Sequence, residues 1–448
     1  MSLIYKKTYL EVYLKYYVEK FIEIINYMSA TKDLHIKKEL LPLFDYTINL
    51  YARNRLLKIL KTPLISEKES IQRQNILKGF IENGVVLNGY SYPILYLREV
   101  YEFLNSYTLQ ELPKKKLKYR IQTSKKDKAI LKSRFAQLIL LFHRLEVFYF
   151  SRINTTCFPE SYQCKLKEIM DFFESFSLSD YEKLIRESSL KDTHIIELSE
   201  IVLKKESKGA IALFWDNLFQ FEAYLSISKG IIERNFIFPQ FSVNSLSVDN
   251  FFHPLLKKPV VNSFKTSNTV ILLTGPNMSG KSTFLKAISI CMYLGQIGIA
   301  IPASKAEIPF FKTISVALHH RDDILSGYSH FMTEIVNLKN VVNQARKEEK
   351  CFAVFDELFS GTNEEDAFEI CTATIKGLSK FKNSIFFIST HIQRLQKSAT
   401  IPGVSSYYID CEFVNKLPKF TYKIKEDWSE LKIGKILFEK EGLSDMLT

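Results

Sequence analysis

The chain has 448 residues, of which 46% are hydrophobic and 25% are charged, and its formal net charge at pH 7 is +12. This length and apolar content predict two or three globular domains and exclude a chain that is too polar to form a core. The positive charge favours an anionic partner, such as nucleic acid or an acidic membrane surface, and a solvated basic surface is the alternative.

The cysteines and the apolar segments indicate the compartment. None of the six cysteines forms a CxxC pair or a Cys/His cluster with zinc-ligand spacing, which is typical of a reducing compartment. The N-terminal segment lacks the uninterrupted apolar run of a signal peptide. Residues 135–150 are the best candidate for a membrane span, but they are few and polar side chains interrupt them. We therefore expect a cytoplasmic protein without membrane insertion.

The first part of the chain, residues 1–240, is predicted to form a mainly α-helical domain. Glycines are few there, and apolar residues recur at helical spacing, as in the group Leu138, Leu141, Phe142 and Leu145. Short breaks, such as the pair Asn83-Gly84, separate the helical segments.

From about residue 240 onward, short β-rich runs alternate with helical stretches. Three of these runs are residues 270–273, 352–355 and 384–389. Apolar strands that alternate with helices predict a largely parallel α/β sheet, and residues 406–425 predict a terminal antiparallel hairpin. The second domain is therefore expected to be an α/β domain over residues 241–448.

A phosphate-binding loop lies between the first of these strands and a predicted helix over residues 282–294. Residues 275–282 match the pattern G-x-x-x-x-G-K-S, in which backbone N–H groups and the helix N-terminus cradle phosphate oxygens. Lys281 can reach the β- and γ-phosphates, and the Ser282 hydroxyl can ligate Mg²⁺. We therefore predict ATP and Mg²⁺ as cofactors. The predicted nucleotide-binding residues here are Gly275, Pro276, Asn277, Met278, Ser279, Gly280, Lys281, Ser282 and Thr283.

Two further strand ends carry candidate catalytic groups. Asp356 and Glu357 follow the strand at residues 351–355, so that Asp356 would hold the Mg²⁺ shell and Glu357 would orient or activate water. His391 follows another apolar strand and could sense the γ-phosphate or polarise water. An ordinary acidic strand end and a structural histidine are the alternatives. We predict Glu357, His391 and Lys281 as catalytic residues, and Ser282 and Asp356 as metal ligands.

Several motifs within residues 253–395 resemble those of the MutS family of DNA mismatch-repair ATPases, in order and approximate spacing. Residues 274–283 read TGPNMSGKST and resemble the family's TGPNMGGKST, with Ser279 in place of a glycine. Residues 326–334, SGYSHFMTE, resemble its SGRSTFMVE, and residues 356–363, DELFSGTN, resemble its DEIGRGTS. Residues 389–391, STH, resemble its ATH.

The resemblance implies a fold and site roles that the residues alone do not give. The second domain would be an ABC-type P-loop ATPase, and its ATP sites would be composite and form across a homodimer. Ser329 would then bind the γ-phosphate held by the partner subunit, with Thr362 and Asn363 at the same interface, and Asn277 would contact phosphate or the catalytic water. The family's adenine platform lies near residues 259–262, where this sequence has no aromatic residue, so the adenine contact stays open.

The helical part also resembles the family. Residues 63–83 and 212–239 are similar to its core helices, and the stretch between them would form its lever arms. At most about 60 residues precede the core, so we expect the family's N-terminal mismatch-recognition domain to be absent. The basic run from Lys114 to Lys128 is the candidate for contacts with the DNA backbone, and a solvated loop is the alternative.

The sequence thus predicts an ATP-dependent DNA-binding protein of the MutS type, in which ATP operates a dimeric clamp on duplex, mismatched or branched DNA. Two alternatives remain open at this point. One is an ABC-type ATPase that serves a membrane or transport partner, because residues 325–329 also resemble an LSGGQ-like signature. The other is a nucleotide-dependent scaffold that binds a protein rather than DNA.

Overall fold

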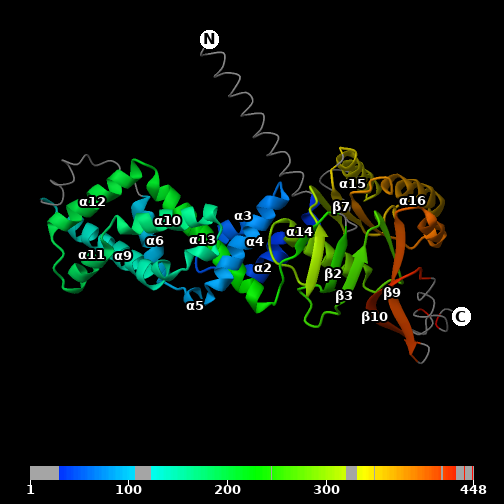
Figure 1. Cartoon of the computed structure of the whole chain (residues 1–448), viewed down its shortest axis with the longest axis horizontal. Helices are drawn as coiled ribbons and strands as arrows, with labels where there is room; N and C mark the ends of the chain where they lie inside the picture. The colour runs from blue at the N-terminus through cyan, green and yellow to red at the C-terminus, as the bar shows by residue number, and fades with distance from the viewer. Residues whose placement is uncertain are drawn as a thin grey trace, which may run out of the picture. The chain divides into compact units, whose positions relative to one another are not determined.

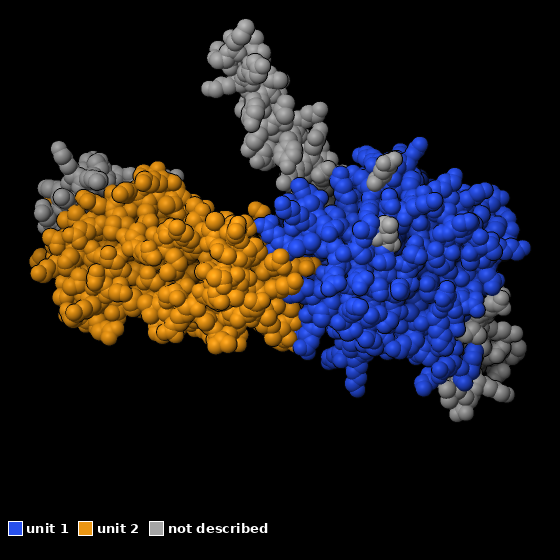
Figure 2. All heavy atoms as spheres, in the orientation of Figure 1, with its two compact units in different colours: residues 1–42, 60–73, 234–448 blue, residues 43–59, 74–233 orange. Residues whose placement is uncertain are grey.

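The computed structural model describes residues 30–105, 123–243, 245–318, 330–347, 349–414 and 417–429, together with Phe438 and Met446. The chain divides into two compact units, which Figure 2 distinguishes by colour. Unit 1 contains residues 1–42, 60–73 and 234–448, and unit 2 contains residues 43–59 and 74–233. The last boundary, at residue 234, lies close to the predicted domain boundary at residue 240, but two earlier segments also belong to unit 1.

Unit 2 is helical, as predicted, and Figure 1 labels most of its helices. Residues Leu138, Leu141, Phe142 and Leu145 are all buried on one face of a long helix, so their helical spacing reflects a core. The ring of Phe172 stacks on that of Phe214, with 4.0 Å between their centroids. The helices that lie wholly or partly in this unit are α2 (Leu41–Phe44), α3 (Leu50–Lys61), α4 (Glu67–Glu82), α5 (Gly84–Leu87), α6 (Ile94–Leu104), α9 (Lys125–Phe148), η3 (Phe150–Arg152), η4 (Thr155–Cys157), α10 (Glu160–Glu174), α11 (Leu178–Arg186), α12 (Asp192–Glu206) and α13 (Ala210–Glu233). Among the described residues, none of the helices combines the length and the apolar character needed to cross a membrane.

A carboxyl group is buried in the core of unit 2. Glu222 of α13 accepts a hydrogen bond from Asn49 Nδ2 at 2.5 Å and another from the Tyr90 hydroxyl at 2.9 Å. Asn49 Nδ2 also donates to the Tyr92 hydroxyl at 2.6 Å. Burial raises the pKa of Glu222 to about 7, although these hydrogen bonds lower it. The cluster therefore links α13 to the segments around residues 49 and 90.

Unit 1 contains two sheets. The larger one has the strand order β10-β9-β4-β8-β7-β6, in which β10 pairs antiparallel with β9 and all other pairs are parallel. The smaller one has the order β1-β5-β2-β3. The strands are β1 (Gln240–Ser242), β2 (Leu246–Phe251), β3 (Asn262–Thr266), β4 (Val270–Thr274), β5 (Lys305–Pro309), β6 (Thr313–Ala317), β7 (Cys351–Phe355), β8 (Ile385–Ser389), β9 (Val404–Val414) and β10 (Leu417–Glu426). The predicted parallel sheet and the terminal hairpin are thus confirmed.

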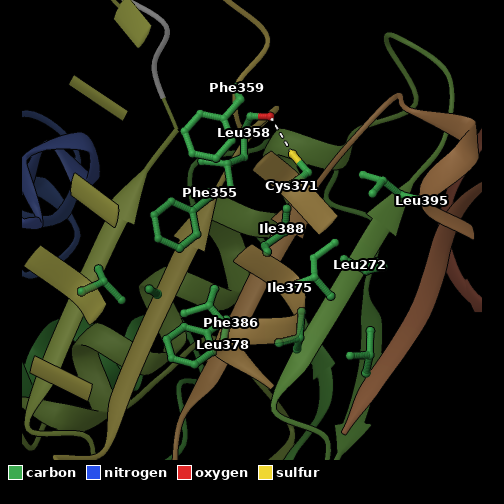
Figure 3. Packing of buried hydrophobic residues seen from close by; sticks show 14 of the residues in the cluster. Leu272, Phe355, Leu358, Phe359, Cys371, Ile375, Leu378, Phe386, Ile388 and Leu395 are labelled. Carbon is green, nitrogen blue, oxygen red and sulfur yellow. Dashed lines mark hydrogen bonds between the residues drawn. The ribbon is translucent and has the colours of Figure 1, made fainter. Parts of the chain in front are cut away.

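The central strands form the core of the larger sheet. Every residue of β4, β7 and β8 is buried, as expected for parallel strands that are covered on both faces. The other elements of this unit are η1 (Lys32–Leu34), η2 (Ile36–Leu40), α14 (Lys281–Gln296), α15 (His330–Ala345), α16 (Glu364–Leu378) and η5 (Gln393–Thr400). Figure 3 shows side chains of α16, such as Ile375, packed with Ile388 and Leu272 of the strands. The mixed α/β architecture agrees with the predicted fold class.

Specific contacts explain why two early segments belong to unit 1. Ser70 Oγ donates to Gln296 O at 2.6 Å, at the end of α14, and Lys286 of the same helix pairs with Glu39 at 2.8 Å. Asp33 accepts a hydrogen bond from Leu318 N at 2.8 Å, just beyond β6. These polar contacts anchor both segments beside the sheet, and local sequence patterns contain no sign of them.

Candidate nucleotide-binding site

The phosphate loop begins where β4 ends at Thr274, and α14 begins at Lys281. Gly275 and Gly280 have φ angles of 134° and 101°, a region that favours glycine. A Cβ atom at Gly275 would also lie 3.1 Å from Ser279 Oγ. Met278 has a φ of 68° although it carries a side chain, so the loop holds a strained residue at its exposed tip. The conformation of the phosphate loop therefore depends on the positive φ angles that Gly275 and Gly280 adopt.

Lys281 folds back onto its own loop. Its ammonium group donates to Gly275 O at 3.0 Å and to Pro276 O at 3.3 Å, and only 5% of the residue is exposed. Burial lowers the pKa of Lys281, whereas the nearby Glu357 and Asp356 raise it. Ser282 and Thr283 are exposed in the first turn of α14. A poorly solvated ammonium group beside a helix N-terminus is a fitting site for a phosphate anion.

The two predicted acids lie beyond the end of β7, next to the end of β8. Asp356 is buried, and it accepts a hydrogen bond from the Ser389 hydroxyl. Glu357 has a φ of 54°, and its backbone N–H donates to Ser389 Oγ at 2.7 Å. Glu357 Oε1 lies 2.6 Å from His391 Nε2. The strand order β4-β8-β7 thus places Lys281, both acids and His391 at one edge of the sheet.

A tyrosine from the terminal hairpin lies beside the phosphate loop. A Cβ atom built on Gly280 would come within 3.0 Å of Tyr422 Cδ1, and 45% of Tyr422 is exposed. Asn262 of β3 holds this part of β10, because its Nδ2 donates to Tyr422 O at 3.0 Å and its Oδ1 accepts from Ile424 N at 2.9 Å. The hairpin thus supplies an aromatic ring where the sequence near residues 259–262 has none.

The comparison with known families agrees with this geometry. Residues 271–443 match the family described as MutS domain V. Over these residues the chain carries a MutS-type domain. The resemblance of the motifs is thereby confirmed.

Three relatives show the extent of the likeness. The DNA mismatch repair protein MutS of Bacillus subtilis is 30% identical over 222 residues, which is 48% of this chain and 25% of that protein. The MutS protein homolog 4 of Homo sapiens is 28% identical over 230 residues, or 48% of this chain and 24% of that protein. The DNA mismatch repair protein MutS of Carboxydothermus hydrogenoformans is 26% identical over 315 residues, or 65% of this chain and 36% of that protein. The chain therefore spans only about a quarter to a third of these relatives.

The residues of this MutS-like site fit ATP and Mg²⁺ by their chemistry. The loop offers backbone N–H groups and an ammonium group for phosphates, while Ser282 and Asp356 offer the oxygen ligands that Mg²⁺ prefers. Their individual roles stay predictions. Asn277 is exposed on the loop, where it can meet a ligand, and Asn363 caps α16 by accepting a hydrogen bond from Asp366 N at 2.9 Å.

Other predicted site residues lie outside the described part of the chain. Ser329 and the rest of residues 319–329 belong to this group, as do residues 106–122, which contain most of the basic run. Of that run, Lys125, Lys126 and Lys128 are described at the start of α9, and Lys128 pairs with Asp192 at 2.7 Å. The partner-subunit contact and the DNA contact therefore stay predictions.

Sequence reasoning missed three residues of the site. The sequence patterns place Ser389 and Tyr422 only within a motif and a hairpin, and Glu334 only at the end of a motif. Glu334 of α15 accepts a hydrogen bond from Phe359 N at 3.3 Å, and burial raises its pKa to about 7. Glu334 lies at helical spacing from Phe331 and Leu338, so an acidic residue on an apolar helix face was the one available signal for it. Nothing local marks the other two.

Proposed function

We propose that the chain binds ATP with Mg²⁺ and hydrolyses it to ADP and phosphate. The observation that carries this proposal is the pair of Glu357 and His391, 2.6 Å apart, at the sheet edge that also presents Lys281. A phosphate loop alone is compatible with binding only. A carboxylate that is oriented by a second side chain beside the loop lysine supplies the group that hydrolysis needs.

Binding would rest on the loop and on α14. The φ angles of Gly275 and Gly280 allow backbone N–H groups to face an anion, and the helix N-terminus adds a partial positive charge. Lys281 would exchange its two loop carbonyl partners for phosphate oxygens. A charged acceptor is a stronger hydrogen-bond partner than a carbonyl in dehydrated surroundings, so this exchange favours the bound state.

Hydrolysis would depend on positioning a water molecule. Glu357 would orient the water and receive its proton as the water oxygen bonds to the γ-phosphorus and the bond to the β–γ bridging oxygen breaks. His391 would hold the Glu357 carboxylate in place through the contact at 2.6 Å. Ser282 and Asp356 would hold Mg²⁺, which neutralises phosphate charge when it is bound. The protein's contribution is therefore geometric and electrostatic.

Tyr422 is the best candidate for the adenine contact. Its half-exposed ring lies next to Gly280, on the side of the loop that the hairpin covers. Aromatic rings bind flat bases by stacking, with a favourable energy of about 1 kcal/mol beyond area burial. This assignment accounts for the lack of an aromatic residue near residues 259–262.

We further propose that hydrolysis serves a homodimeric clamp on DNA, with each ATP site completed by Ser329 from the second subunit. Two relatives carry the name DNA mismatch repair protein. The net charge of +12 and the lysines at the start of α9 suit contacts with a phosphate backbone. Such contacts imply that DNA affinity falls steeply with salt.

The ATPase proposal is tested with matched lysine variants of α14. Lys281→Ala is expected to weaken ATP binding about a hundredfold or more, whereas Lys286→Ala, which removes only the ion pair with Glu39, leaves it unchanged. Glu357→Gln is expected to bind ATP normally and to lower kcat by about 10²- to 10⁴-fold. Calorimetric titration with ATP and phosphate release measure the two effects. Normal hydrolysis by Glu357→Gln would refute the assignment of the water-orienting residue.

The DNA proposal needs a separate test, because every alternative predicts ATP binding. Hydrolysis and binding are measured with perfect, mismatched and branched duplexes at low and high salt. Stimulation or salt-sensitive binding supports the clamp. The absence of both would refute it and leave an ABC-type ATPase with a membrane partner, or a nucleotide-dependent protein scaffold.

A further inference from the structure

The last residue of β8, Ser389, touches both acids of the site. Its side chain is fully buried between the ends of β7 and β4. Ser389 Oγ accepts a hydrogen bond from Glu357 N at 2.7 Å and donates its own proton to Asp356 Oδ1. A single hydroxyl group therefore connects two consecutive residues to which the mechanism gives different roles.

We propose that Ser389 is a positioning residue that sets the conformation of Asp356 and Glu357 for ATP hydrolysis. This inference rests on the ATPase function proposed above. Alanine, the residue in the ATH motif that this segment resembles, can supply neither hydrogen bond. This chain therefore differs from the motif at Ser389, and the motif itself assigns no role to the hydroxyl group.

Ser389 first restrains the backbone of Glu357. Its φ of 54° lies in the left-handed region, which is unfavourable for a residue with a Cβ atom and persists only where neighbours hold it. The hydrogen bond from Glu357 N to Ser389 Oγ is such a restraint. The backbone conformation at residue 357 sets the direction of the Cα–Cβ bond. The restraint therefore also helps to place the Glu357 carboxylate against His391.

Ser389 also orients the carboxylate of Asp356. Ser389 Oγ has only one proton, and the Asp356 carboxylate accepts it. A hydrogen bond to an ionised, buried acceptor is stronger than one between neutral groups and fixes the orientation of the acceptor. The Asp356 carboxylate is therefore held in one rotamer, from which it can serve as the predicted Mg²⁺ ligand.

The chain contains a matched control for this residue. Ser384 precedes β8, is also buried, and its Oγ accepts a hydrogen bond from Cys351 N at 3.0 Å. Cys351 begins β7, so Ser384 and Ser389 join the same two strands at opposite ends. Removing either hydroxyl deprives one buried N–H group of its partner, but only Ser389 contacts the acids.

The test compares Ser389→Ala, Ser389→Cys and Ser384→Ala with the unmodified chain. Ser389→Ala is expected to lower kcat about ten- to a hundredfold, while the Kd for ATP with Mg²⁺ changes less than about fivefold. Ser389→Cys keeps the volume but offers only a weak donor, so it is expected to lose most of the same rate. Ser384→Ala is expected to lower the Tm as much as Ser389→Ala does and to keep kcat within about twofold. Phosphate release, calorimetry and thermal unfolding give these values.

Two results would overturn the proposal. One is a kcat of Ser389→Ala or Ser389→Cys close to that of the unmodified chain, and the other is an equal loss of kcat in Ser384→Ala. A crystal structure of Ser389→Ala tests the geometry without any hydrolysis: Glu357 is expected to leave the left-handed region, and an unchanged φ at Glu357 contradicts the inference. If the unmodified chain binds ATP but does not hydrolyse it, the proposed function fails, and this structural comparison still decides the role of Ser389.

Discussion

The buried carboxyl group of Glu222 makes the stability of the helical unit depend on pH. Its pKa rises from an ordinary value of 4.5 to about 7 because the side chain is buried in the core of unit 2. A tenfold change in proton affinity corresponds to about 1.4 kcal/mol, so ionising Glu222 costs about 3 kcal/mol more in the folded protein than in the unfolded chain. Between pH 4.5 and pH 7 the folded state keeps a proton that the unfolded state has released. The free energy of unfolding therefore falls as the pH rises through this window.

Glu222→Gln removes this titration and keeps the size of the side chain. We expect the variant to match the parent near pH 4.5 and to be about 2 to 3 kcal/mol more stable at pH 8. Urea unfolding is followed by the fluorescence of Trp215 of α13, in a background in which Trp428, the second tryptophan of the chain, is replaced by Phe. Glu197→Gln is the control, because Glu197 is exposed yet also accepts a hydrogen bond from a tyrosine hydroxyl, that of Tyr181.

The comparison with Glu197→Gln decides the outcome. The control is expected to keep the pH dependence of the parent between pH 4.5 and pH 7. A parent protein whose free energy of unfolding is flat across this window would refute the reasoning. So would a Glu222→Gln variant that retains the slope, because the titrating group would then lie elsewhere.

Two further predictions concern the nucleotide site. His391→Ala is expected to lower kcat about ten- to a hundredfold with little change in the Kd for ATP, because it releases only the Glu357 carboxylate; an increase in Kd equal to the loss of kcat would contradict this role. Tyr422→Ala is expected to weaken ATP binding about five- to tenfold, whereas Tyr422→Phe keeps the ring and the affinity. Calorimetric titrations with ATP and with inorganic triphosphate, which has no base, check this assignment, and an equal loss for both ligands would count against stacking.

The sequence alone determined the elements that carry the site. The phosphate loop and the two acids each follow directly after an apolar strand in the sequence. Residues 270–273 precede the loop, and residues 352–355 precede both acids. The buried, apolar character of parallel strands and the turn chemistry of glycine are local properties, so a local pattern can show them. The same motifs were sufficient to indicate the MutS family.

Only the tertiary structure decided how these groups support one another. Ser389 reaches Glu357 because β8 lies between β4 and β7, although 32 residues separate the two along the chain. Tyr422 lies in β10 where its pairing with β9 is irregular, and the side chain of Asn262 bonds to its backbone there. The two residues are 160 positions apart in the chain. The burial of Glu222 likewise depends on segments around residues 49 and 90. Strand order, register and burial arise from contacts distant in the chain, and the periodicity of any single segment carries no information about its partners.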